Sequence, residues 1–134
     1  MSTVQPISDI IAQMDAGLDR AVLRCLEKRV GEQLAIQKPS LLFDLNRMGF
    51  GSRLSHDTFE RQVRSCIVAL RKQGHLICSS SGGGGYYLAE NLGEFDEFIE
   101  REYRGKIKDM QETVDVMCES ARKRWGTGVQ MGLF

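Results

Sequence analysis

Residues 55–89 read SHDTFERQVRSCIVALRKQGHLICSSSGGGGYYLA, and this stretch decides the fold. Its first part has apolar residues at every third or fourth position, which is typical of an amphipathic helix. Its second part has two short apolar runs separated by serines and glycines, which is typical of a β-hairpin. We therefore predict a helix that leads directly into a small hairpin.

Both ends of the predicted helix carry boundary signals. Ser55 or Asp57 can cap the first turn by accepting a backbone N–H bond, and Gly74 can adopt the left-handed conformation that ends a helix. The strands are expected at residues 76–78 and 86–88. The loop between them, residues 79–85, is longer than a tight turn.

The N-terminal half contains signals for three more helices. Apolar spacing predicts a short helix within residues 7–14 and a second that begins near Asp19 and ends at Gly31. Pro39 opens the third helix. The turn after it, GFGSRL at residues 49–54, is longer than the three- to four-residue turn of the simplest helix-turn-helix.

Four motifs follow one another in this region: RQVR at 61–64, LRKQG at 70–74, ICSSS at 77–81 and GYYL at 85–88. Together they resemble the winged helix-turn-helix proteins of bacteriophages and prophages, over roughly residues 17–124. The resemblance implies a mainly α fold with a small β-hairpin (α+β), in which a long C-terminal helix follows the winged helix. It specifies the fold more than the function, because winged helices also serve as protein-interaction modules.

This interpretation divides the chain into four parts. Residues 1–16 form an N-terminal arm or short helix, and residues 17–89 form the winged-helix domain. Residues 90–124 form the long helix, which can serve for dimerisation, and residues 125–134 form a flexible tail.

Charge is balanced overall but not along the chain. The 18 basic and 18 acidic residues give a formal net charge of zero, which argues against a generic nucleic-acid coat protein. Residues 53–72 are locally positive, however, with five basic and two acidic side chains. Residues 90–119 carry ten acidic against four basic side chains, and a phosphate backbone would repel them.

If duplex DNA is the ligand, the first turns of the helix at residues 55–72 enter the major groove. The candidates for contact with base edges are His56, Thr58, Arg61, Gln62 and Ser65. Arg61 can pair with guanine and Gln62 with adenine. The candidates for phosphate contact are Arg53, Arg64, Arg71, Lys72 and Ser80. The alternative is that these side chains form a solvated helix face.

The hairpin loop carries no charged residue, which weakens the case for a contact in the minor groove. Its serine hydroxyls and glycine N–H groups can bond phosphate oxygens, although the glycine run Gly82–Gly85 favours a mobile loop. The loop is not a nucleotide-binding motif, because no GK[ST] follows it.

The long helix contains an apolar seam with alternating steps of three and four residues: Ile107, Met110, Val114, Met117 and Ala121. This spacing is typical of helix pairing and predicts a homodimer. The alternative is that the seam packs on its own domain.

The last five residues read QMGLF. Gln130, Leu133 and Phe134 resemble the pentapeptide that binds the bacterial sliding clamp, in which the glutamine and the Leu-Phe pair enter a pocket. Docking of this tail on its own domain or on a dimer mate, and the absence of any role, are the alternatives.

The remaining features exclude several classes. There is no run of about 18 apolar residues and no basic region followed by an apolar stretch, so we expect a cytoplasmic protein without membrane contact. The cysteines, which lie in apolar patterns, are expected to be reduced core thiols rather than ligands of a metal: Cys25, Cys66, Cys78 and Cys118. His56 and His75 lie about 28 Å apart along one helix, and no catalytic or cofactor-binding constellation is evident.

The sequence therefore predicts a non-enzymatic protein that binds duplex DNA in transcription regulation or DNA replication. The alternative is an oligomeric adaptor that does not bind DNA and docks partners, including the sliding clamp, through its tail. Salt-dependent DNA affinity distinguishes the two, because phosphate contacts release counterions.

Overall fold

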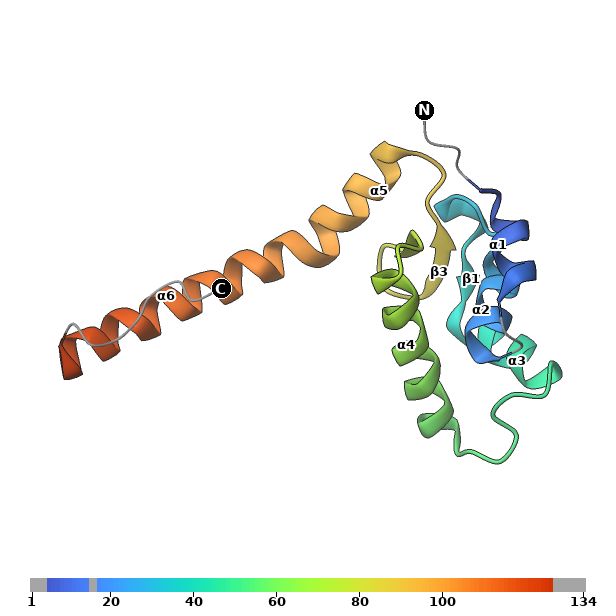
Figure 1. Cartoon of the computed structure of the whole chain (residues 1–134), viewed down its shortest axis with the longest axis horizontal. Helices are drawn as coiled ribbons and strands as arrows, with labels where there is room; N and C mark the ends of the chain where they lie inside the picture. The colour runs from blue at the N-terminus through green and yellow to red at the C-terminus, as the bar shows by residue number, and fades with distance from the viewer. Residues whose placement is uncertain (1–4, 15–16, 127–134) are drawn as a thin grey trace. The chain divides into compact units, whose positions relative to one another are not determined.

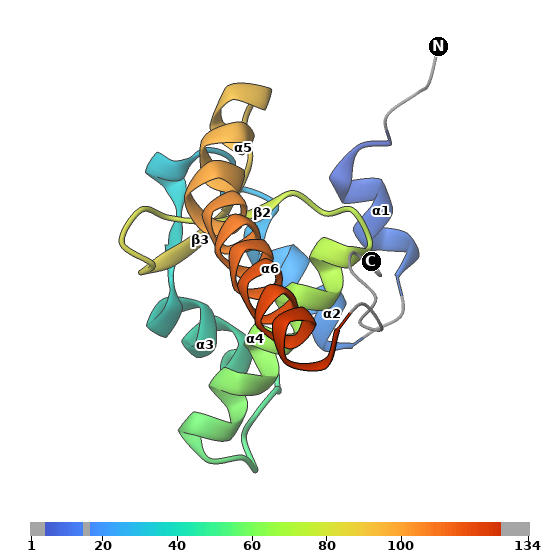
Figure 2. The same ribbon diagram turned by 90° about the vertical axis from the view of Figure 1, so that its left-hand side faces the viewer.

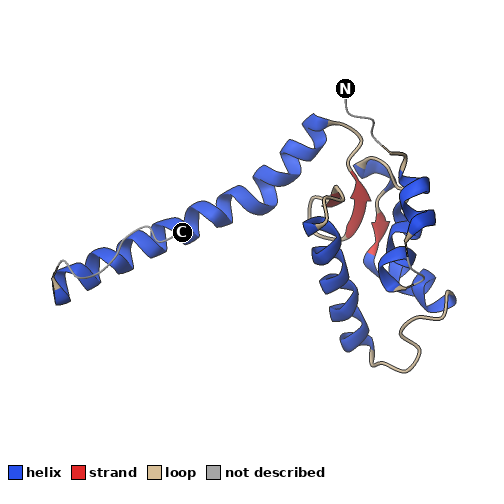
Figure 3. Cartoon of the chain, in the orientation of Figure 1, coloured by secondary structure: helices blue, strands red, loops and turns tan. Residues whose placement is uncertain are grey.

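The computed structural model describes residues 5–14 and 17–126 (Figure 1). The chain divides after Phe95 into two units, residues 1–95 and 96–134. The described residues are mainly helical, with one small antiparallel sheet in the first unit (Figure 3), which confirms the predicted α+β class. None of the described helices combines the length and apolar character needed to cross a membrane.

The first unit begins with α1 (Ile7–Gln13) and α2 (Leu18–Leu26), close to the predicted positions. The sequence predicts that this second helix ends at Gly31, but α2 ends five residues earlier, at Leu26. Gly31 instead adopts a positive φ of 93°, and its N–H donates to the carbonyl of Leu88 at 2.8 Å. The glycine therefore joins the segment after α2 to the sheet.

A strand that the sequence does not predict, β1 (Ile36–Gln37), precedes α3 (Lys38–Arg47). Pro39 lies in the first turn of α3, as expected from its missing N–H and fixed φ. β1 has only two residues, so it cannot show the alternation by which a strand is recognised. β1 is recognised instead by its antiparallel pairing with a later strand.

The helix predicted after Ser55 is α4 (His56–Lys72). The Ser55 hydroxyl accepts a hydrogen bond from the Thr58 N–H at 3.2 Å, which confirms the predicted cap. Gly74 has a φ of 100° just beyond the helix, as predicted. The buried side chains of α4 are Phe59, Val63, Cys66, Ile67 and Leu70.

The hairpin consists of β2 (Ile77–Ser79) and β3 (Gly85–Leu88). The sheet is antiparallel with strand order β1-β3-β2, and Cys78 pairs with Tyr87 in its register. Ser79 and Gly85 belong to the strands, so the hairpin loop is residues 80–84 and is shorter than the predicted seven residues.

The core of the first unit lies where α2, α3 and α4 meet the sheet (Figure 2). Ile11 of α1, Leu23 of α2, Leu45 of α3 and Leu70 of α4 have no exposed surface. Ile36 and Ile77 contribute from the strands. The elements around this apolar cluster are, in chain order, α1, α2, β1, α3, α4, β2 and β3.

The segment after the sheet is helical up to Trp125. The side chain of Asn91 accepts a hydrogen bond from the Glu94 N–H at 2.9 Å at the start of α5 (Leu92–Ile99), which confirms Asn91 as a cap. A π-helical turn, Glu100–Arg104, then separates α5 from α6 (Gly105–Trp125).

The π-helical turn departs from the regular helix that the sequence predicts. Phe98 and Tyr103 are five residues apart, and their rings meet edge to face with centroids 5.7 Å apart. In a regular α-helix residues at this separation point in different directions, whereas the wider turn brings them to one side. The turn also changes the phase of the apolar pattern between Ile99 and Ile107.

Gly85 allows β1 and β3 to approach closely, and its replacement tests this constraint. A Cβ atom at Gly85 would lie 2.5 Å from the carbonyl oxygen of Ile36, which is backbone and cannot move away cheaply. We expect Gly85→Ala to lower the free energy of unfolding by about 1–3 kcal/mol, measured by urea denaturation.

Gly84→Ala is the matched control, because its nearest atom is the flexible side-chain oxygen of Gln37 at 2.9 Å. A similar loss in both variants would show that the Gly85–Ile36 approach is not the limiting contact.

Candidate functional site

The exposed face of α4 carries four of the five residues predicted to reach base edges. Thr58, Arg61, Gln62 and Ser65 are spaced at i, i+3, i+4 and i+7, and all four are exposed. This spacing places them on one side of a helix, opposite the buried residues. We call this set the outer stripe.

The basic side chains near the outer stripe are available to a ligand. Arg53, Arg61 and Lys72 are exposed and form no ion pair with any residue in the described part of the chain. Arg53 precedes α4 and Lys72 is its last residue, so positive charge is present at both ends of the helix and in its middle.

The fifth predicted base contact, His56, lies on another side of α4. It forms a row with Glu60 and Arg64, which follow it at i+4 and i+8. The His56 Nε2 atom is 3.7 Å from one Glu60 oxygen, and the Arg64 guanidinium is 3.2 Å from the other. We call these three residues the side stripe. Its central carboxylate contacts both His56 and Arg64.

Arg71 is engaged within the protein. Its Nε donates to the carbonyl of Ile77 at 2.7 Å, and an Nη donates to the Ser79 hydroxyl at 3.1 Å. The side chain is half-buried and ties the end of α4 to β2. Among the predicted phosphate contacts, Arg71 therefore already has a structural role.

The hairpin loop is fastened by hydrogen bonds. The Ser80 hydroxyl accepts from the Gly85 N–H at 2.9 Å, so this predicted phosphate contact belongs to the turn itself. The Glu32 carboxylate accepts from both the N–H and the hydroxyl of Ser81, at 2.6 and 2.9 Å. Glu32, which the sequence analysis did not single out, places negative charge against the loop.

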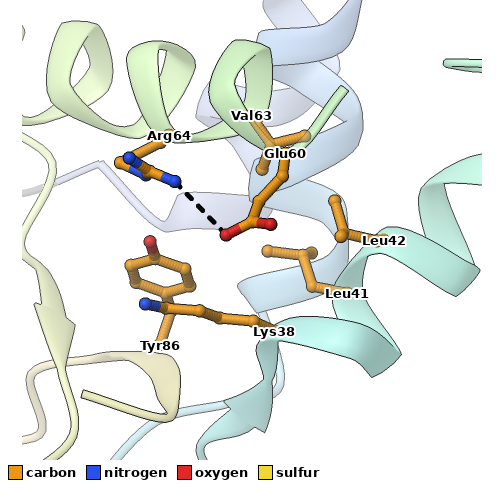
Figure 4. A pocket seen from close by; sticks show the side chains of 7 residues that line it. All are labelled: Lys38, Leu41, Leu42, Glu60, Val63, Arg64 and Tyr86. Atoms are coloured by element: carbon orange, nitrogen blue, oxygen red, sulfur yellow. Dashed lines mark hydrogen bonds and ion pairs between the residues drawn. The ribbon is translucent and has the colours of Figure 1, made fainter. Parts of the chain in front are cut away.

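A small hollow lies beside α4, between the start of α3 and β3 (Figure 4). Its lining consists of Lys38, Leu41, Leu42, Glu60, Val63, Arg64 and Tyr86. Of these residues, the sequence analysis proposed only Arg64 as a contact for a ligand. The i, i+4 spacing of Glu60 and Arg64 predicts their ion pair, but no sequence signal connects them to Lys38 or Tyr86.

One cluster of potential metal ligands occurs among the described residues, although the sequence predicts none. Single ligand atoms of His56, Asp57 and Glu60 lie within 4.8 Å of one another. His56 and Asp57 are exposed, and Glu60 already pairs with Arg64. These ion-pairing and solvation roles account for the cluster.

All four cysteines are free, but the prediction that all of them are core thiols is wrong for Cys118, which lies on α6, a helix without buried residues. Cys66 and Cys78 are buried, whereas Cys25 and Cys118 are half-buried. The Cys66 thiol donates to the Asp19 carboxylate at 2.8 Å and joins α4 to α2. Burial, and then this hydrogen bond and the Asp19 charge, raise the pKa of Cys66 to about 12.

The predicted apolar seam of α6 is accessible. Ile107, Met110 and Met117 are exposed, and Val114 and Ala121 are half-buried.

The predicted partner-binding residues Gln130, Leu133 and Phe134 lie outside the described residues. No family model, curated protein or solved structure matches this chain.

The raised pKa of Cys66 predicts a pH-dependent stability. Folding favours the protonated thiol, so its contribution is complete below the usual pKa of 9.0 and is lost as the pH rises toward about 12. Urea unfolding of the wild type should therefore show a stability loss between pH 8.5 and about 10.5 that Cys66→Ala reduces. Equal losses in the two proteins would contradict this assignment.

Proposed function

We propose that this chain is a winged-helix protein that binds duplex DNA through α4. The fold supports the proposal through its element order, in which three helices, α2, α3 and α4, lead into the β2–β3 hairpin. In helix-turn-helix proteins the second helix of the motif lies in the major groove. Here that helix is α4.

The single observation that carries the proposal is the outer stripe. It presents a guanidinium, a carboxamide and two hydroxyls from Thr58 to Ser65, all exposed. These groups can donate and accept hydrogen bonds at base edges. Arg61 forms no ion pair within the described residues, so binding need not first break one.

Phosphate contacts would flank the outer stripe. Arg53 and Lys72 lie at opposite ends of a helix of 17 residues, which is about 25 Å long. Cations at these positions can hold the two backbones that border a groove, while Arg61 and Gln62 read the bases between them. Asp57 and Glu60 reduce the local charge, which favours a sequence-selective contact over indiscriminate binding.

A second copy of the chain would present a second α4. The exposed seam of α6 has the spacing of a helix pair, and a dimer would suit a two-fold site in DNA. A role in transcription or in replication fits this chemistry equally. Attachment of QMGLF to the sliding clamp would favour replication.

The adaptor is the second candidate function. Specific support comes from the hairpin loop, which carries no cation and has the Glu32 carboxylate bound to Ser81. A loop of this kind suits a protein partner better than a minor groove. In this case α4 and the α6 seam would both contact protein.

Arg61→Ala tests the DNA-binding proposal. Fluorescence anisotropy with a labelled duplex across a salt series should show a sloped log affinity for the wild type. On the specific site, the variant should lose about 1–3 kcal/mol of binding free energy, or roughly ten- to a hundredfold in affinity.

Gln33→Ala is the control, because this exposed side chain lies outside α4. Affinity that is flat or absent at low salt would exclude DNA binding and leave the adaptor as the function of the chain.

Met117→Lys tests the dimer. The residue lies in the seam and is 66% exposed, so the change should leave the fold intact while placing a charge in a helix pair. Light scattering should show a monomer, and affinity for a duplex with two half-sites should fall.

Val116→Lys is a matched control, since Val116 is 67% exposed but lies outside the seam. If both variants remain dimeric, or if the wild type is a monomer, the α6 seam does not mediate self-association.

A further inference from the structure

The apolar seam of α6 has no cover within the described part of the chain. α6 has 21 residues, and none of them is buried. Three large side chains of the seam, Ile107, Met110 and Met117, are 62%, 69% and 66% exposed. Helices in proteins are stabilised mainly by packing of an apolar face against another element. The alternating steps of three and four residues in this seam suit a second helix as that element.

Charged side chains divide the second unit into four blocks of alternating sign. Residues 96–102 carry four acidic and one basic side chain, and residues 104–108 carry three basic and no acidic ones. Residues 109–119 carry four acidic and no basic side chains, and residues 122–124 are all basic. We call these blocks 1 to 4 in chain order. A helix that covers the seam along its length would run past blocks of both signs.

This order of blocks distinguishes the two ways in which identical helices form a closed pair. In a parallel pair with a two-fold axis every residue lies opposite its own copy, so each block faces its own sign. In an antiparallel pair the order of one helix is reversed. Block 1 then faces the partner's block 4, and block 2 faces the partner's block 3. Both contacts join opposite signs, so the charges favour the antiparallel pair.

The apolar seam supplies a register that agrees with the charges. When two such seams run in opposite directions, a register exists in which Ile107 stacks on the partner's Met117 and Met110 stacks on the partner's Val114. The two-fold axis then passes near residue 112. All four of these side chains are in contact across the pair, so the register covers the seam.

The same register brings blocks of opposite sign together at both ends of the pair. Glu100 lies opposite the partner's Arg124, and Glu102 lies opposite the partner's Arg122. Arg101 lies opposite a cation, Lys123 of the partner, but it already forms an ion pair with Glu102 of its own helix at 3.4 Å. The ends of the pair therefore attract each other.

Like charges meet only at the centre of this register, and they lie away from the seam. Block 3 crosses its own copy there, through Asp109, Glu112 and Asp115. At 3.6 residues per turn, these three residues are more than about 100° around the helix from the middle of the seam. Water can screen carboxylates on the outer side of a helix pair.

We propose that the α6 seam pairs with the seam of a second copy of this chain in the antiparallel direction, with the two-fold axis near residue 112. This inference rests on the dimer of the proposed function and adds its direction and register. Residue 96 of one copy then lies about 48 Å along the axis from residue 96 of the other, at helical rise. The chains would continue into their first units from opposite ends of the pair.

Cysteine crosslinking in the full-length protein tests the direction. Cys118→Ser first removes the thiol beside the seam, and this parent variant is the control for background linkage. Met117→Cys in that background should give no disulfide-linked dimer on mild oxidation, because the two thiols lie about 15 Å apart along the axis. Met117→Cys combined with Ile107→Cys should become linked, since each new thiol then faces the other.

Charge reversal tests the blocks independently. Arg122→Glu, Lys123→Glu and Arg124→Glu together should weaken dimerisation roughly tenfold, because block 4 would then repel the partner's block 1 at both ends. The further changes Glu100→Lys and Glu102→Lys in the same chain should restore it. In a parallel pair a reversed block still faces its own sign, so neither set would alter the affinity. Sedimentation gives the dissociation constants, and circular dichroism checks that the helix persists.

The salt dependence of the wild-type dimer gives a third test, in which only the sign matters. Added sodium chloride should weaken an antiparallel dimer, because salt screens the attraction between blocks 1 and 4. A parallel dimer should become tighter, because salt would screen repulsion.

The outcomes separate this inference from the proposed function. If the wild type is a monomer, the dimer fails and the inference with it, whereas DNA binding through α4 is judged by its own salt series. If the wild type is a dimer but Met117→Cys alone becomes linked, or salt tightens the dimer, the antiparallel direction is wrong and the dimer stands. A dimer in which neither cysteine variant becomes linked would place the contact outside the seam.

Discussion

Burial of one face of α4 is the interaction on which the rest of the first unit depends. Phe59, Val63 and Ile67 pack into the cluster that α2, α3 and the sheet share, and each such side chain contributes about 1.5–3 kcal/mol through removal of apolar surface from water. The same packing determines which residues remain outside. Because a helix has a fixed period, the position of the buried face leaves Thr58, Arg61, Gln62 and Ser65 in solvent.

Electrostatics then divides the cations of this region into two groups. Arg71 is bonded to β2 and Arg64 to Glu60, whereas Arg61 forms no ion pair within the described residues. A chain with no net charge can still attract a polyanion when its unpaired cations lie on one surface. The difference between paired and unpaired arginines is therefore more informative about a ligand than the total charge.

Local signals predicted much of the fold, and contacts between distant residues account for what was missed. The period of α4 and the Ser55 cap depend on neighbouring residues, so both can be read from the sequence. β1 and the Glu32–Ser81 contact depend on residues about 50 positions apart, and no local pattern encodes them. The candidate site divides in the same way. The outer stripe follows from helical spacing, whereas the hollow requires the folded positions of α3, α4 and β3.

The bonds from Arg71 to β2 have a further consequence for recognition. They connect the C-terminal end of α4 to the first strand of the hairpin within the folded chain. A surface assembled before it meets its target loses little backbone entropy on association, and most of the ordering cost falls on the exposed side chains. Adaptation to different targets would then come from rotamers such as those of Arg61 and Gln62, with the backbone of α4 held constant.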